Sequence, residues 1–91
     1  MATKQQLLNR ILSRLRKMQA ELEQTIRDKE WWNDNRTDAE PFDIGWNRVI
    51  LRYVNLQLEA WGRGDVASAT KWNIKMHEWA MQHERAINGN S

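Results

Sequence analysis

Cysteine is absent from this 91-residue sequence, which excludes disulfides, thiolate catalysis and zinc or iron–sulfur sites built on cysteine. One proline and four glycines are too few for a turn-rich all-β domain. No run of about 18 apolar residues occurs, so no membrane-spanning helix is predicted. No apolar stretch with a small-residue cleavage site indicates export. We therefore expect a cytoplasmic protein that does not engage a membrane.

Sequence motifs for catalysis or metal binding are also missing. His77 and His83 are six positions apart and point about 240° apart on a helix, so they cannot share a metal ion there. No serine lies in a nucleophile elbow, no glycine-rich phosphate loop occurs, and the acidic residues lack the spacing of a calcium loop. We therefore expect a protein that is not an enzyme and uses no metal and no cofactor.

The charged residues are unevenly placed along the chain. The net charge is only +2, but residues 1–20 contain five bases and no acid, whereas residues 21–43 contain eight acids and three bases. A chain with this charge distribution favours self-association, basic segment against acidic segment, at least as much as it favours binding to nucleic acid.

A long first helix is predicted over about residues 3–30. Thr3 and Gln6 have the spacing of a capping box, and no glycine or proline interrupts the segment. At 1.5 Å per residue this helix is about 40 Å long, which is more than a globule of this size needs. Apolar residues recur along one face with a spacing close to a heptad, and we predict that they form a seam between copies of the chain: Leu8, Ile11, Leu15, Met18, Leu22 and Ile26.

An acidic loop is expected over about residues 31–43, with Asp43 as the N-cap of a second helix over about 44–62. That helix is apolar nearly all round, which predicts burial on several sides. Gly64 and Asp65 then predict a left-handed residue followed by an N-cap, so a third helix over about 66–87 folds back as an antiparallel hairpin.

The fold class expected is therefore all-α, with helix over more than about two-thirds of one domain, residues 1–91. It consists of the long N-terminal helix and the antiparallel helical hairpin. We expect this small bundle to be completed by oligomerisation, because the first helix outruns the hairpin and the second is apolar on too many sides.

Six tryptophans are the outlying feature of the composition. Trp31 and Trp32 are adjacent, so their side chains diverge and at least one of them cannot face the core. Tryptophan is enriched in interface hot spots, and acidic neighbours favour a basic partner surface. We therefore predict that segment 31–40 recognises a partner protein, through Trp31, Trp32, Asp34, Asp38 and Glu40. The other four tryptophans lie on expected helix faces, where packing explains them if their indole N–H groups reach partners: Trp46, Trp61, Trp72 and Trp79.

Basic residues near the N-terminus form a second candidate surface, which could contact nucleic-acid phosphates: Arg10, Arg14, Arg16 and Lys17. Three of these, Arg10, Arg14 and Lys17, lie within about 60° on one helix flank. The alternatives are a solvated flank, or one that pairs with the acids of another copy.

These patterns favour a small, non-enzymatic, homo-oligomeric protein that binds or blocks a macromolecular partner. Short helical proteins without catalytic motifs are typical of accessory proteins from bacterial viruses and mobile elements. The alternative is a nucleic-acid-binding regulator that uses the basic N-terminal helix. A third, minor hypothesis is a small-ligand binder with a tryptophan-lined cleft.

Overall fold

The computed structural model describes residues 2–38 and 40–88, with side chains through Arg85, and that part of the chain contains helices and no strand. The three helices have 32, 18 and 23 residues and are named here by their bounds: α1 (Lys4–Asn35), α2 (Gly45–Gly62) and α3 (Val66–Asn88). The expectation of an all-α chain that is more than two-thirds helical is confirmed.

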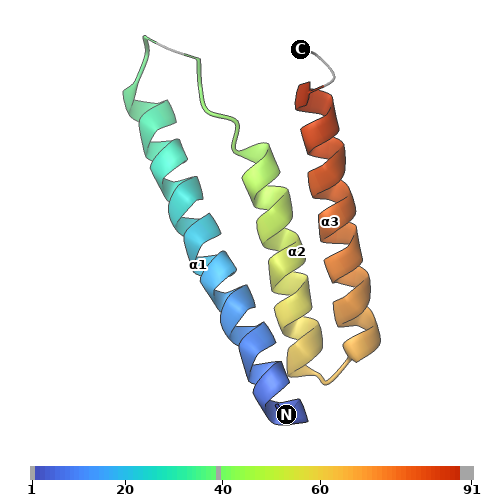
Figure 1. The fold of residues 1–91 in the computed structure, drawn as a ribbon. Coiled ribbons are helices and arrows are strands. Elements are labelled where there is room, and N and C mark those ends of the chain that lie inside the picture. The colour runs from blue at the N-terminus through green and yellow to red at the C-terminus, as the bar shows by residue number, and fades with distance from the viewer. Residues whose placement is uncertain (1, 39, 89–91) are drawn as a thin grey trace.

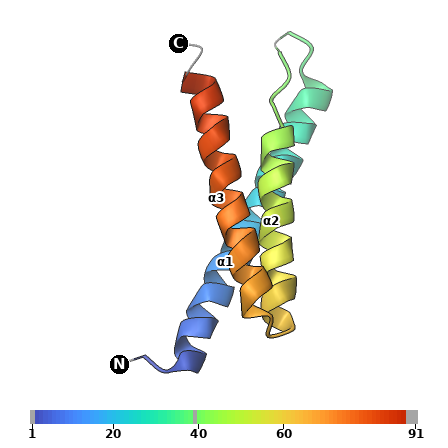
Figure 2. The same ribbon diagram turned by 90° about the vertical axis from the view of Figure 1, so that its right-hand side faces the viewer.

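Helix α2 lies between the other two helices and runs antiparallel to both (Figures 1 and 2). Both α1 and α3 pack on α2, but in the described residues no Cα atom of α1 comes within 8 Å of a Cα atom of α3. This position explains why α2 is apolar nearly all round, because two of its faces are covered. α2 and α3 form an antiparallel hairpin.

One apolar core connects the three helices. Leu15 of α1, Ile50 and Val54 of α2, and Met76 of α3 form a buried cluster, and Val54 has no exposed surface. Partly buried side chains pack around this cluster from all three helices: Met18, Leu22, Trp46, Tyr53, Leu58, Trp61, Trp79 and Ala80. The core therefore depends on α2, which supplies its centre.

The start of α1 is as predicted, but its end is not. The Gln6 N–H donates to Thr3 Oγ1 at 3.1 Å and the Thr3 N–H donates to Gln6 Oε1 at 2.9 Å, which completes the capping box. The helix continues beyond residue 30 to Asn35, so the connection to α2 comprises residues 36–44 and not 31–43. The Arg36 N–H still donates to the Trp32 carbonyl at 2.9 Å.

Asp43 is not the N-cap of α2, as the sequence had indicated; Ile44 occupies that position and its side chain makes no capping bond. The Asp43 carboxylate instead accepts the N–H of Gly45, the first residue of α2, at 3.0 Å. It therefore satisfies a free helix donor from one position further out.

The turn between α2 and α3 has the expected chemistry. Gly64 has φ +70°, the left-handed conformation that glycine adopts without strain. Asp65 accepts the Ser68 N–H at 3.0 Å and so caps α3. Hydrogen bonds from the Ser68 hydroxyl and backbone hold the pKa of the Asp65 carboxyl below its ordinary value of 3.8.

Substitution of Gly64 by alanine tests this turn. Open space surrounds Gly64, so Gly64→Ala introduces no clash and destabilises the protein through the positive φ alone, by about 1–2 kcal/mol. A thermal melt should show a fall in Tm of roughly 4–8 °C per kcal/mol. The matched control is Gly62→Ala, also in open space but at the end of α2, which should leave Tm unchanged or raise it. Equal effects of the two substitutions would contradict this interpretation.

The molecule is more extended than its mass requires. Its radius of gyration is 16.0 Å, whereas a compact domain of this length has about 12 Å. It exposes 7080 Å² for a mass of 10.9 kDa, about 1,500 Å² more than the scaling for monomeric proteins gives. No helix in the described part of the chain is long and apolar enough to span a bilayer.

Candidate functional site

The apolar stripe of α1 is used largely within the chain itself. Leu15 and Ile26 are buried, and Met18 and Leu22 pack against the core that α2 builds. This corrects the expectation that the whole stripe forms a seam between copies. The periodicity correctly predicted a buried face of α1, but this face packs on α2 of the same chain. Only the N-terminal part of the stripe, Leu8 and Ile11, is left for a contact between copies, and Ile11 is 39% exposed.

Trp31 and Trp32 both face away from the core, at the end of α1 that extends beyond α2 (Figure 1). Both residues lie within the last turns of α1, and the helix continues beyond them. Measured around the helix from buried Ile26, Trp31 points about 140° away in one direction and Trp32 about 120° away in the other. The side chains are 56% and 46% exposed, and their rings meet edge to face with centroids 4.8 Å apart.

The loop that follows α1 adds two residues to this surface. The Arg36 guanidinium lies over the Trp32 ring at 5.9 Å and over the Phe42 ring at 5.2 Å, and Phe42 is 43% exposed. We call the four residues Trp31, Trp32, Arg36 and Phe42 the aromatic cluster. Sequence reasoning missed Arg36 and Phe42; the available signal was the single phenylalanine of the chain, an apolar residue in a polar loop.

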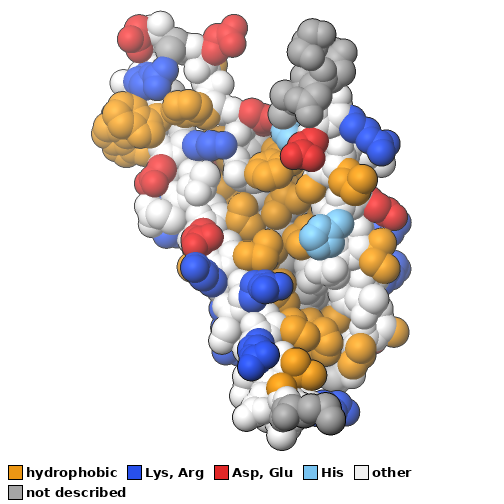
Figure 3. Space-filling view, viewed as in Figure 1, with side chains coloured by type: hydrophobic (Ala, Val, Ile, Leu, Met, Phe, Trp, Pro, Cys, Tyr) orange, Lys and Arg blue, Asp and Glu red, His pale blue; other side chains and the backbone are white. Residues whose placement is uncertain are grey.

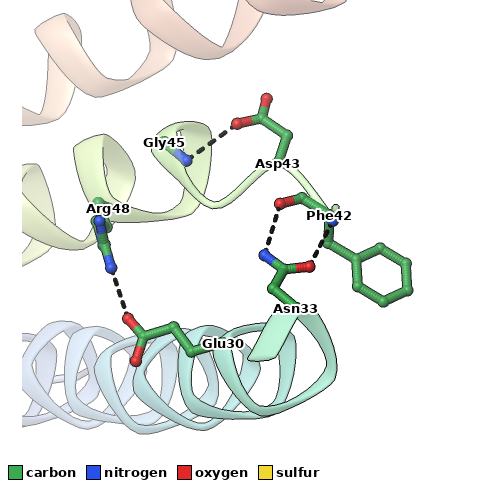
Figure 4. A network of polar contacts seen from close by, with 6 residues as sticks. All are labelled: Glu30, Asn33, Phe42, Asp43, Gly45 and Arg48. Atoms are coloured by element: carbon green, nitrogen blue, oxygen red, sulfur yellow. Dashed lines mark hydrogen bonds and ion pairs between the residues drawn. The ribbon is translucent and has the colours of Figure 1, made fainter. Parts of the chain in front are cut away.

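Polar contacts hold the loop in place against α1 and α2 (Figure 4). The Asn33 side chain binds the backbone of Phe42 at both its atoms: its Oδ1 accepts the Phe42 N–H at 2.6 Å and its Nδ2 donates to the Phe42 carbonyl at 3.0 Å. The Arg48 guanidinium of α2 pairs with Glu30 of α1 at 2.6 Å. The two Asn33 hydrogen bonds hold the Phe42 backbone against the last turn of α1, and the ion pair joins α1 to the first turn of α2.

The acids that the sequence singled out are exposed in the same segment. Asp34 lies in the last turn of α1, and Asp38 and Glu40 lie in the loop; residue 39 between them is outside the described residues. Asp38 is 87% exposed at its side chain and only 4.0 Å from Arg36 Nε. The segment that carries the aromatic cluster therefore also carries exposed negative charge that is open to a partner.

A groove lies at the opposite end of the molecule, between α1 and α3 and over α2. Its volume is about 510 Å³, and we call it the basic groove. In Figure 3 hydrophobic side chains run down this face, bordered on the α1 side by Lys and Arg. The residues that line it come from all three helices: Leu7, Arg10, Ile11, Arg14, Leu15, Met18, Gln57, Trp61, Ala69, Thr70, Asn73, Met76 and His77.

The four basic residues proposed to bind nucleic acid do not form one surface in the structure. Arg10 and Arg14 line the basic groove, whereas Arg16 and Lys17 are exposed outside it. Among the described residues, no carboxylate lies within 4.0 Å of the charged groups of these four. Their positive charge is therefore available to a partner.

The remaining tryptophans are partly buried, but the expectation about their indole N–H groups is not fulfilled. The Nε1 atoms of Trp46 and Trp79 are buried and have no hydrogen-bond partner among the described residues. Trp46 stacks at a tilt on His83, with ring centroids 5.2 Å apart, so His83 is a packing residue. Trp61 lines the basic groove, and Trp72 lies against Tyr53 and under Lys71.

Comparisons with known proteins find no matching family model, curated protein or solved structure. Among the described residues, no three His, Cys, Asp or Glu side chains are placed to hold a metal ion. The candidate functional surfaces are therefore the aromatic cluster with its acids and the basic groove.

Proposed function

We propose that this chain is a small, non-enzymatic interaction protein that binds or blocks a macromolecular partner through the aromatic cluster and the acids around it. The observation that supports this proposal is the exposure of three large aromatic side chains, by 43–56%, within one ordered segment. Tryptophan is the residue most enriched in binding hot spots, and a protein of this size gains no stability from leaving two of them in water.

The way the cluster is held favours binding. The Asn33 side chain holds the Phe42 backbone through two hydrogen bonds, and the rings of Trp31 and Trp32 pack edge to face. A preordered surface loses less conformational entropy on association than a flexible one does. The surrounding carboxylates favour a partner with a basic patch and disfavour a nucleic acid at this end of the molecule.

Self-association belongs to the same proposal. Each chain exposes about 1,500 Å² more surface than the scaling for monomers gives, which is about twice the roughly 800 Å² that one partner buries in a protein interface of standard size. We further propose that the protein acts in the cytoplasm, in the manner of an accessory or inhibitor protein of a virus or mobile element. Its size and its lack of catalytic motifs support that part.

Removal of both tryptophans tests the recognition surface. Trp31→Ala with Trp32→Ala should reduce capture of a partner from a lysate of the source organism by at least about 100-fold, which corresponds to about 3 kcal/mol. Helix content by circular dichroism should stay unchanged, because neither side chain is in the core.

A control for that experiment removes exposed apolar surface elsewhere. Ile74→Ala with Met81→Ala on α3, where both side chains are about half exposed, should leave capture intact. Unchanged capture by the tryptophan variant, or an equal loss in the control, would show that the aromatic cluster is not the recognition surface.

The second candidate function is nucleic-acid binding through Arg10, Arg14, Arg16 and Lys17, which form no ion pair with a carboxylate of the described residues. Contact with phosphates releases counterions, so affinity for a random duplex would fall steeply with salt concentration. A steep fall, together with its loss when all four residues are replaced by glutamine, would favour this function. Absence of duplex binding at low salt would remove it.

A further inference from the structure

Charge is separated along the long axis of the molecule. The end with the basic groove carries the base-only N-terminal half of α1, and Lys71 and Lys75 lie in the first half of α3 at the same end of the molecule. The opposite end carries the segment 31–43, which has four acids and one base. The basic end of one molecule therefore attracts the acidic end of another. These two ends are separated along a molecule 53 Å long.

We propose that the basic groove is the binding site for the aromatic cluster of a second copy of this chain. The inference rests on the proposed function, because it uses the same cluster, and it identifies one partner of that cluster as the chain itself. The groove of one copy receives Trp31, Trp32 and Phe42 of the next.

The apolar surfaces of the two sites match. The floor of the groove is built by Leu15, Met18 and Met76, with Ile11 and Leu7 exposed by 39% and 49% at its α1 side. A hollow of about 510 Å³ is in the range that encloses a drug-sized molecule, so it has room for aromatic side chains. Methionine is an adaptable residue that packs well against aromatic rings.

The charges of the two sites are complementary. Arg10 and Arg14 border the groove, and in the described part of the chain no carboxylate lies within 4.0 Å of their charged groups. Asp34, Asp38 and Glu40 are exposed in the segment that carries the cluster. Arginine forms two-pronged bonds with carboxylates and also stacks on tryptophan faces, so both kinds of group in the cluster suit it. A groove–groove contact would instead bring the arginines of two copies together.

The contact joins two different surfaces of the chain. A pair of antiparallel copies can exchange clusters and close with two-fold symmetry, and any other arrangement runs from copy to copy into a closed ring or an open filament. In both cases each copy uses one cluster and one groove. This property distinguishes the proposal from an interface between identical patches, and mixing two variants tests it.

One variant changes the groove, Arg10→Glu with Arg14→Glu, and the other removes the cluster, Trp31→Ala with Trp32→Ala. In sedimentation experiments at micromolar concentration the wild-type chain should form species of at least two chains, and each variant alone should be monomeric. An equimolar mixture of the two variants should form a two-chain species, because the intact cluster of the first fits the intact groove of the second. Arg16→Glu with Lys17→Glu, the same charge change outside the groove, should keep the wild-type mass.

Each result decides the proposal. A monomeric wild-type chain, or a mixture of variants that stays monomeric, would overturn it. If the wild-type chain is monomeric but the tryptophan variant still loses capture of a foreign partner, the proposed function stands and this inference fails. If the mixture associates but no foreign partner is captured, this inference stands alone. Should the double arginine variant lose its helix content, Ile11→Asp replaces it as the groove variant.

Discussion

Leu15→Asp is expected to unfold the protein at every concentration. Leu15 is 4% exposed and lies in the cluster that joins α1 to α2 and α3. Loss of the leucine side chain from such a site costs about 2–5 kcal/mol, and burial of an unpaired carboxylate adds several more. A domain of this length has about 5–14 kcal/mol of stability in all. Circular dichroism should show loss of most helix signal at 25 °C, with no recovery as protein concentration rises.

The control lies one helical turn earlier. Ile11→Asp places the same charge at a side chain that is 39% exposed in the basic groove, so the helix content should remain close to that of the wild type. A Leu15→Asp variant that melts within a few degrees of the wild type would show that α1 does not depend on this contact. Such a result would favour the interpretation in which the apolar stripe of α1 forms a contact between copies.

Gln57→Ala should cause the second large loss of stability. Gln57 is 2% exposed and lies in the C-terminal half of α2. Its Oε1 accepts Asn73 Nδ2 at 3.1 Å, and its Nε2 donates to the Tyr53 carbonyl at 3.3 Å and to Met76 Sδ at 3.6 Å. Truncation leaves a hole beside Met76 and takes the partner from the Asn73 amide. We expect a cost of about 2–4 kcal/mol, and a fall in Tm of roughly 10–25 °C.

Gln57→Met separates packing from hydrogen bonding. Methionine is close to glutamine in size and flexibility, so most of the packing is kept while the hydrogen bonds to Asn73, the Tyr53 carbonyl and Met76 Sδ are lost. The expected cost is about 1–2 kcal/mol. A chemical denaturation curve for each variant gives both numbers. If Gln57→Met is as harmful as Gln57→Ala, hydrogen bonding and not volume dominates this site; a negligible effect of Gln57→Ala would contradict its place at the centre of the core.

The sequence predicted those parts of the fold that depend on near neighbours. Thr3 and Gln6 form a capping box within one turn, and Gly64 and Asp65 make the hairpin junction with residues no further than Ser68. The end of α1 was predicted five residues too early, because local preferences for turn formers such as Asn33 were read alone. In the structure the Asn33 side chain binds the Phe42 backbone, nine residues away, and the helix remains intact.

The candidate site was predictable only in part. The adjacency of Trp31 and Trp32 showed that the two side chains could not both be buried. It did not show that both are exposed, as they are in the structure. The basic groove could not be read from the sequence, because it depends on the angle at which α1 crosses α2 and on the separation of α1 from α3 (Figure 2). The period of an apolar stripe likewise identifies a covered face of the helix but not the surface that covers it. For this reason the predicted seam between copies included residues of α1 that pack on α2 of the same chain.

The central position of α2 also sets the order in which the native structure can come apart. Because α1 and α3 each pack on α2, release of α1 leaves the α2–α3 hairpin with its own contacts, and release of α3 leaves α1 on α2. Loss of α2 removes both interfaces at once. Every helix pair in contact is also adjacent along the chain, so loop closures are short and folding of this topology belongs in the microsecond to millisecond range. The last amides to exchange with solvent are therefore those in the middle of α2, and the exposed first turns of α1 are the first to open.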